Sequence, residues 1–309
     1  MLWPMPRRPV CYVTAPSWPA RSPAEADETR AALQPLAEAC GFEVRISPLL
    51  ERAWAGHGAW SDPAERVADL KLALRHELVW AHRGGFGCIQ LLPEALRLRA
   101  RGRPGFAGYS DNTVLHALWW QRGWDEAFYS GRPPRSPGSR HLSSLLALLR
   151  GEDLLGDATT MPGTRPLHDG HAEGRLFVGC LSVLAHLAGT PLQPDLRGAI
   201  LCLEDIDEKP YSVEFALSQL HLAGALRGIR GLACGFFTYT EKNDYVGPHV
   251  DAVLARWAER LGVPCVDRLP FGHLDDHLVL PTGRPAVLDV RRGRWSLQLL
   301  PRAKPPWVA

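Results

Sequence analysis

Short apolar segments alternate with capped, amphipathic segments through the first 130 residues, and this alternation restricts the folds open to the chain. Ser22 and Asp62 each precede a proline that is followed two residues later by a glutamate, the pattern of a helix N-terminus. Strands that alternate with helices form a parallel sheet covered by helices, so we predict an α/β fold here. The predicted elements are strands 10–14, 42–46, 78–81 and 106–109 and helices 23–40, 62–76 and 112–122.

The character of the sequence changes after residue 130. The stretch 131–174 is rich in Pro, Gly, Arg and Ser around one predicted helix, 142–149, and we interpret it as a linker. Beyond it, Ser212 is predicted to cap a helix that runs to about Leu222, and residues 286–300 read as a β-hairpin. We therefore predict an N-terminal α/β domain (1–130), a linker (131–174) and a C-terminal domain (175–309). Strands 199–203 and 232–237 and a helix over 250–261 complete the expected elements.

Composition excludes several classes of function. The formal net charge is only +2, without the basic clustering of a nucleic-acid partner. The seven cysteines are scattered, mostly in apolar runs, and we interpret them as reduced residues of a cytosolic protein. No apolar run approaches the ~20 residues of a membrane helix, and no signal-peptide pattern opens the chain. We therefore expect a cytoplasmic protein without a membrane partner.

Ser110 is the first candidate for chemistry. It lies in Gly108-Tyr109-Ser110-Asp111-Asn112, between a predicted strand and a predicted helix. A serine at such a turn exposes its hydroxyl, and the following backbone N–H groups point toward an oxyanion that would develop there. One alternative is that Ser110 or Asp111 only caps the helix. The second glycine of the usual G-x-S-x-G pattern is also missing.

Glu204 begins a carboxylate cluster, residues 204–208, at the end of a predicted buried strand. A carboxylate at this position can hold an imidazole in the tautomer needed by a general base. Asp205 is the local rival for that role. Asp207 and Glu208 are better explained as part of a solvated loop.

His273 follows a glycine in Phe271-Gly272-His273, where a loop leaves room for an imidazole to approach a nucleophile. It can equally be a surface histidine. Nearby Asp275, Asp276 and His277 raise a metal cluster as a rival, although a strong zinc spacing such as H-E-x-x-H is absent.

A glycine-rich turn, Arg83-Gly84-Gly85-Phe86-Gly87, follows the third predicted strand. Glycines allow backbone N–H groups to approach a ligand closely. The turn contains neither the G-x-G-x-x-G fingerprint nor a Walker lysine. It is therefore either a tight connection or part of a binding site.

Taken together, these segments resemble the murein tetrapeptide LD-carboxypeptidase family of serine peptidases, which also includes microcin-immunity proteins. The resemblance covers almost the whole chain in the same order. The matching segments are Ala15-Pro16-Ser17, residues 83–87 with Leu92-Pro93, residues 108–113 with Leu115-His116, residues 187–191, residues 203–206 with Glu208, Pro210 and Tyr211, and residues 271–273 with Leu280-Pro281. The chain departs from the family where His-Gly-Pro is common, at Ser130-Gly131-Arg132, and where Asn is frequent, at Cys180.

The resemblance implies a Rossmann-like N-terminal domain, a mixed β-rich C-terminal domain and a homodimer. It also implies a catalytic triad of Ser110 as nucleophile, Glu204 as orienting acid and His273 as base. We expect the backbone N–H groups of Asp111 and Gly85 to form the oxyanion hole, and Arg83 is our guess for the substrate carboxylate. No metal or organic cofactor is expected.

The implied reaction is removal of the terminal D-alanine from a murein tetrapeptide during cell-wall recycling. A microcin-immunity-type peptidase, which would cleave a peptide-nucleotide or related conjugate, is the alternative, and an aromatic stack for a nucleobase would favour it. A classical α/β-hydrolase shares the order Ser, acid, His but conflicts with the missing glycine. A catalytically silent binding protein for cell-wall peptides is the third alternative.

Overall fold

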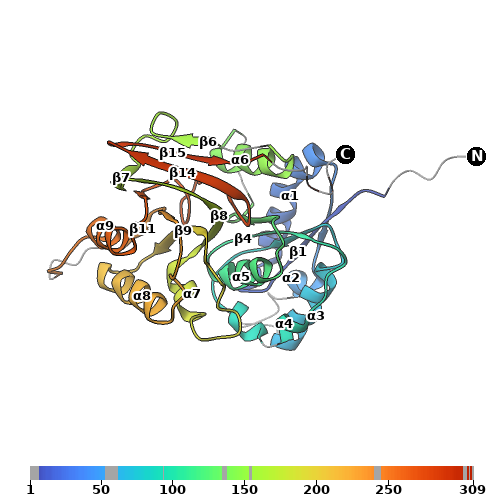
Figure 1. Ribbon diagram of the computed structural model, residues 1–309. Helices are drawn as coiled ribbons and strands as arrows, with labels where there is room; N and C mark the ends of the chain where they lie inside the picture. The colour runs from blue at the N-terminus through green and yellow to red at the C-terminus, as the bar shows by residue number, and fades with distance from the viewer. Residues whose placement is uncertain are drawn as a thin grey trace, which may run out of the picture.

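The computed structural model describes residues 7–52, 62–92, 94–133, 138–152, 155–239, 245–301, 305 and 307. The chain forms two sheets, each flanked by helices, that lie side by side (Figure 1). A fold with a Rossmann-like first half and a mixed, β-rich second half was predicted, and the structure confirms it. Every helix in the described part of the chain is too short or too polar to span a bilayer.

The first sheet has the strand order β13-β5-β4-β3-β1-β2. Strands β1 to β5 are parallel, whereas the edge strand β13 is antiparallel to β5. The carboxyl ends of the parallel strands therefore meet along one edge of the sheet, where ligands bind in open α/β sheets. The strands are β1 (Val10–Thr14), β2 (Glu43–Ile46), β3 (Leu78–Ala81), β4 (Gly105–Gly108), β5 (Ala127–Tyr129) and β13 (Leu280–Thr282).

Helices cover both faces of this sheet because its strands are apolar on both sides. In β1, Val10 and Tyr12 pack on one core, and Cys11 and Val13 pack on the other. The predicted ends of α1 (Pro23–Cys40) are confirmed, with Ser22 as N-cap and Gly41 in the left-handed region at the C-terminus. The other helices of this half are α2 (Pro48–Arg52), α3 (Pro63–Ala73), α4 (Glu94–Arg97) and α5 (Thr113–Gln121), with short 3₁₀ turns at Cys88–Leu91 and Ser110–Asn112.

The second sheet has the order β6-β15-β14-β8-β9-β10-β12-β7, and β11 pairs with β9 beside it. Its centre is parallel (β8, β9, β10 and β12), and its flanks are antiparallel. The strands are β6 (Leu155–Asp157), β7 (Arg165–His168), β8 (Gly170–Cys180), β9 (Ala199–Ile206), β10 (Gly231–Ala233), β11 (Phe237–Thr238), β12 (Cys265–Asp267), β14 (Pro285–Arg291) and β15 (Arg294–Leu299). The helices are α6 (Arg140–Leu149), α7 (Leu181–His186), α8 (Pro210–Leu222) and α9 (Val250–Leu261).

The predicted hairpin is confirmed as β14 and β15, and Arg292 and Gly293 both have positive φ at its turn. The Ser212 cap is wrong. α8 begins at Pro210, with Lys209 as its N-cap residue. Proline is favoured at the first helical position because it has no backbone N–H that would need a partner there.

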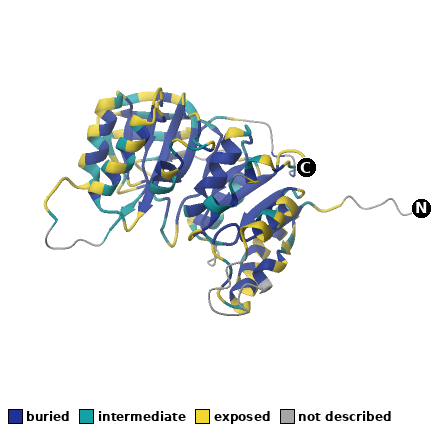
Figure 2. Cartoon of the chain, turned by 90° about the horizontal axis from the view of Figure 1, so that it is seen from below, coloured by how far each residue is buried: buried dark blue, intermediate teal, exposed yellow. Residues whose placement is uncertain are grey.

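The stretch interpreted as a linker contains α6, β6, β7 and the start of β8. α6 packs against α1 of the first half, while β6 and β7 join the second sheet. The boundaries given above for the two domains and the linker stay a prediction. Buried residues are continuous between the halves (Figure 2), and the Cys180 backbone N–H donates to Thr113 Oγ1 at 3.0 Å across the junction.

Candidate active site

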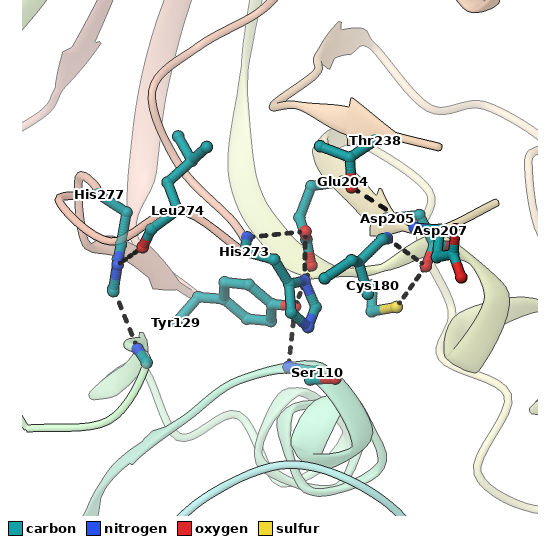
Figure 3. A network of polar contacts seen from close by, with 12 residues as sticks. Ser110, Tyr129, Cys180, Glu204, Asp205, Asp207, Thr238, His273, Leu274 and His277 are labelled. Atoms are coloured by element: carbon teal, nitrogen blue, oxygen red, sulfur yellow. Dashed lines mark hydrogen bonds and ion pairs between the residues drawn. The ribbon is translucent and has the colours of Figure 1, made fainter. Parts of the chain in front are cut away.

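Ser110, Glu204 and His273 come from three separate parts of the chain and gather where the two sheets meet (Figure 3). Ser110 directly follows β4 and its neighbour Tyr109. Glu204 lies near the end of β9, and His273 lies in the loop between β12 and β13. These residues are about 70 or more positions apart in the sequence, and they meet because each follows or lies near the carboxyl end of a parallel strand.

Ser110 occupies a strained turn. Its φ of 59° lies in the left-handed region, which is uncommon for a residue with a side chain and is enriched at turns and at functional sites. Thr113 Oγ1 donates to the Ser110 carbonyl at 2.7 Å and holds the turn closed. Gly84 is packed so closely that an added Cβ would lie 2.8 Å from Ser110 Cβ. The glycine-rich turn therefore makes room for the serine.

Glu204 and His273 lie in the geometry of a partly buried ion pair. His273 Nδ1 lies 2.8 Å from Glu204 Oε2, and the His273 backbone N–H donates to the same oxygen at 3.2 Å. Glu204 is completely buried, and a Cβ on Gly272 would collide with its carboxylate. With Nδ1–H directed at Glu204, Nε2 is the nitrogen left to accept a proton.

The pKa of His273 reflects two opposing effects. Burial lowers it, whereas the hydrogen bond and the negative charge of Glu204 raise it, and the net pKa is above the ordinary value. The imidazolium that forms when a base takes a proton is thus stabilised by Glu204. Within the described residues, no hydrogen bond joins the Ser110 hydroxyl to the imidazole of His273 (Figure 3). In enzymes without substrate, catalytic hydrogen bonds are often long or unformed and tighten in the complex.

Tyr129, at the end of β5, is a member of the site that the sequence analysis missed. Its hydroxyl accepts from the Ser110 backbone N–H at 2.9 Å and donates to Glu204 Oε1 at 2.6 Å. Burial, followed by the charge of Glu204, raises the pKa of Tyr129 well above its usual value, so the phenol keeps its proton and remains a donor. A tyrosine in an apolar strand gives no sequence signal for this role. Only the pairing of Gly108 with Tyr129 in neighbouring strands reveals it.

Asp205, the rival of Glu204, serves another purpose. Its carboxylate accepts hydrogen bonds from Ser182 N at 2.7 Å, Ile206 N at 3.0 Å and Cys180 Sγ at 3.1 Å. These partners lie at the start of α7 and at the end of β9, so Asp205 fastens this helix to the strand. Burial raises the pKa of Asp205 to about 6.

Asp111 is also a structural carboxylate. It accepts from Ser17 Oγ at 2.6 Å and from the Cys88 backbone N–H at 2.8 Å, and thereby joins the loops that follow β1, β3 and β4. Its side chain does not cap α5, which shows no side-chain cap hydrogen bond. Asp111 can contribute its backbone N–H to a reaction, but its carboxylate is already engaged.

His277 uses both ring nitrogens within the protein. Nε2 accepts from the Gly131 N–H at 3.0 Å, and Nδ1 lies 3.0 Å from the Leu274 carbonyl. In the described residues, no three side chains of His, Cys, Asp or Glu are grouped as metal ligands. His277 instead ties the segment after β5 to the loop that carries His273.

Arg83 and Gly85 lie in the turn beside Ser110. Gly85 has a φ of 121° and packs against the ring of Trp18, which leaves no space for a side chain. Arg83 Nη1 lies 3.5 Å from Glu25 Oε1, and its guanidinium stacks over Trp18. The Arg83 carbonyl accepts from Asn112 Nδ2 at 3.1 Å.

A cavity of about 830 Å³ opens beside the base. Its lining includes Tyr109 and His273 and charged groups of both signs, Arg132 on one hand and Asp275 and Asp276 on the other. A space of this size holds a small ligand rather than a folded protein. The remaining lining residues are Gly131, Pro133, Gly138, Ser139, His141, Ile206, Gly272, Leu274 and His277.

Comparison with known proteins identifies relatives of this arrangement. Residues 11–130 match the model of the LD-carboxypeptidase N-terminal domain, and residues 173–288 match that of the LD-carboxypeptidase C-terminal domain. A murein tetrapeptide carboxypeptidase of Pseudomonas aeruginosa is 32% identical over 228 residues, which span 70% of this chain and 74% of the relative.

Two solved structures illustrate the range of the likeness. The muramoyltetrapeptide carboxypeptidase from Oxalobacter formigenes superposes with a TM-score of 0.79 at 28% identity, over 95% of this chain and all (100%) of that one. The protein MccF in complex with glutamyl sulfamoyl guanosine gives a TM-score of 0.75 at 18% identity, over 96% and 97% of the two chains. At that identity the second likeness establishes a shared fold alone.

Proposed function

The chain belongs to the LD-carboxypeptidase family of serine peptidases, and from that membership we propose that it removes the terminal D-alanine of murein tetrapeptides. Ser110 is the nucleophile, His273 the general base and Glu204 the acid that orients the base. The observation that carries this proposal is the contact of 2.8 Å between His273 Nδ1 and Oε2 of the buried Glu204, placed over the strained turn of Ser110.

The reaction proceeds with protein groups and water. Ser110 Oγ attacks the scissile carbonyl while His273 Nε2 accepts its proton. Glu204 holds the imidazole by Nδ1 and stabilises its charged form. His273 then protonates the leaving amine of D-alanine, and water releases the acyl-enzyme with the roles reversed.

The oxyanion of the tetrahedral intermediate needs donors that are free to face it. The Ser110 N–H is directed at Tyr129 and is therefore engaged elsewhere. We retain the backbone N–H groups of Asp111 and Gly85 for this role, because they follow the nucleophile and the adjacent glycine turn.

The cavity supports a small charged peptide as substrate. A tetrapeptide with free carboxylates and an amino group carries charges of both signs, as the lining does. The immunity-type alternative calls for a surface on which a nucleobase can stack. The lining contains the aromatic ring of Tyr109, which offers such a surface. The mixed charges of the lining, and not a lack of aromatic groups, are therefore the reason to prefer the peptide.

Purified protein incubated with L-Ala-γ-D-Glu-meso-diaminopimelyl-D-Ala tests the proposal. Mass spectrometry should find tripeptide and free D-alanine with the parent protein and neither with Ser110→Ala. Parent protein that leaves the tetrapeptide intact but cleaves an aminoacyl-nucleotide conjugate would replace this proposal with the immunity-type activity.

We also propose that the enzyme acts in the cytoplasm, as a homodimer, on peptides recovered from the cell wall. The scattered, unpaired cysteines, all seven of them free thiols, fit a reducing compartment. Sedimentation velocity tests the dimer, and cell fractionation tests the location.

A further inference from the structure

Three arginines converge on one buried carboxylate next to the cavity. Arg21 Nη2, Arg83 Nη1 and Arg132 Nη2 lie 3.3, 3.5 and 3.2 Å from Glu25 Oε1. The Glu25 side chain is 9% exposed, and those of Arg83 and Arg132 are 12% and 31% exposed, whereas that of Arg21 is 72% exposed. We call these four residues the arginine cluster.

The arginine cluster has more positive than negative charge. One carboxylate faces three guanidinium groups, which leaves two positive charges in excess when all four are ionised. The neighbouring His82 does not change this balance, because burial lowers its pKa to about 4 and keeps it neutral. The pKa of Arg83 is lowered, first by burial and next by repulsion from Arg132. A second carboxylate would relieve this repulsion.

Arg83 also has unused donors. Its Nε and Nη1 are buried and make no hydrogen bond within the described residues, since the 3.5 Å approach of Nη1 to Glu25 is ionic only. A buried donor without an acceptor destabilises the folded protein, so these donors call for an explanation, and a bound anion that offsets the positive charge of the cluster supplies one.

Arg132 connects the cluster to the reacting groups. It lines the cavity together with Tyr109 and His273, and the rings of Tyr109 and His273 lie 5.2 Å apart. The nucleophile, Ser110, is the next residue after Tyr109. The lining also contains Asp275 and Asp276, whose carboxylates repel an anion. An anionic group beside Ser110 is therefore drawn to Arg132.

In a carboxypeptidase substrate the terminal carboxylate is separated from the scissile carbonyl by only the amide nitrogen and one Cα, about 4 Å at most. We propose that Arg132, supported from behind by Arg83, binds this carboxylate and makes the enzyme selective for a free C-terminus. The inference rests on the proposed function.

Paired substrates test the proposal: the tetrapeptide with a free D-alanine carboxylate and the same peptide ending in D-alaninamide. Arg132→Ala should lower kcat/KM for the free acid roughly 10- to 100-fold, the loss of one charge-assisted hydrogen bond. It should lower kcat/KM for the amide much less, because the neutral terminal amide forms no ion pair with Arg132, so the ratio of acid to amide falls. Arg132→Lys should keep part of the ratio. Arg21→Ala is the matched control, because it removes an exposed partner of Glu25 that does not line the cavity, and it should preserve the ratio.

An equal loss for both substrates in Arg132→Ala and Arg132→Lys would overturn the proposal and assign Arg132 a structural role. The ratio of affinities for the same pair, measured by calorimetry in a Ser110→Ala background, does not require turnover. If the parent protein fails to hydrolyse the tetrapeptide, the proposed function fails, and this ratio still decides the role of Arg132. An acid-to-amide affinity ratio that Arg132→Ala does not change, or no binding of the free acid, would refute the assignment of Arg132 to the terminal carboxylate.

Discussion

The hydroxyl of Tyr129 lies between the backbone N–H of Ser110, at 2.9 Å, and Oε1 of Glu204, at 2.6 Å. It connects the turn of the nucleophile, in the first sheet, to the acid, in the second. Because Glu204 uses its other oxygen for His273, one buried carboxylate is fixed from both sides. The positions of nucleophile and base are therefore coupled through groups that do not react.

Tyr129→Phe is expected to lower kcat by roughly 5- to 50-fold with little change in KM, because the N–H of Ser110 and one oxygen of Glu204 lose a buried partner. Steady-state kinetics on the tetrapeptide measure this. Tyr12→Phe is the control, since Tyr12 donates to the buried Asp69 at 2.8 Å from the same kind of strand. It should lower the melting temperature while kcat stays the same. Equal kinetic losses in both variants would contradict a positioning role for Tyr129.

The pH profile should reflect the raised pKa of His273. The imidazole must be neutral to accept the proton, so kcat/KM should rise with pH through a value above the ordinary histidine pKa of about 6.5. Glu204→Gln removes the charge that raises this pKa, and its much weaker activity should rise at lower pH. An acidic limb that does not move in Glu204→Gln would contradict the assignment.

The Glu204–His273 pair should also make the stability of the protein depend on pH, with a trend opposite to that of activity. A histidine whose pKa is raised by folding stabilises the protein fully below its unfolded pKa and loses that contribution as pH rises through the folded value. The His273 contribution to the free energy of unfolding should thus decrease over the pH range in which activity increases. Chemical denaturation of the parent protein and of His273→Gln, compared over that range, measures the difference.

Gly272→Ala should reduce activity more than 10-fold. The new methyl group would collide with the Glu204 carboxylate, and the φ of 105° at this position disfavours a side chain at a cost of order 1–3 kcal/mol. Gly262→Ala is the matched control, because Gly262 ends α9 with a φ of 66° and has open space around it. It should cost stability without loss of kcat. Full activity in Gly272→Ala would show that the Glu204 geometry tolerates displacement.

The variant Asp205→Asn should distinguish the structural role of Asp205 from the catalytic role of Glu204. The pKa of Asp205 is raised by burial to about 6, so the folded protein binds its proton more tightly than the unfolded chain. Stability should therefore fall as pH rises from about 4 to 6, and this fall should disappear in Asp205→Asn. Turnover at neutral pH should remain within a few-fold of the parent. Loss of turnover as severe as in Glu204→Gln would return Asp205 to the catalytic group.

Local signals in the sequence were sufficient to predict structure where neighbouring residues determine it. Ser22 and Gly41 bound α1 because a cap and a left-handed residue act on adjacent backbone groups. The turn at Ser110 was likewise visible from the strand and helix on either side. Ser212 was misassigned because Pro210 offers a competing start for the same helix.

Tyr129 and Arg132 could not be predicted because their roles depend on partners distant in sequence. Tyr129 contacts Glu204, 75 residues away, and Arg132 contacts Glu25 across the first half of the chain. Tyr129 lies in no recognisable motif, and Arg132 stands out in the sequence only as a departure from the His-Gly-Pro pattern of the family. Only the tertiary structure, which aligns β4 with β5 and brings the end of β9 to them, makes these partners neighbours.

The loop that carries His273 starts from β12 in one sheet and ends at β13 in the other. A fragment restricted to the first 130 residues would therefore leave β5 as an open edge, with backbone donors and acceptors of Ala127 and Tyr129 available to other chains. Edges of this kind promote aggregation, and β13 covers this edge only once residues 280–282 have been synthesised. The same C-terminal segment therefore supplies both the catalytic base and the strand that covers the edge of the first sheet.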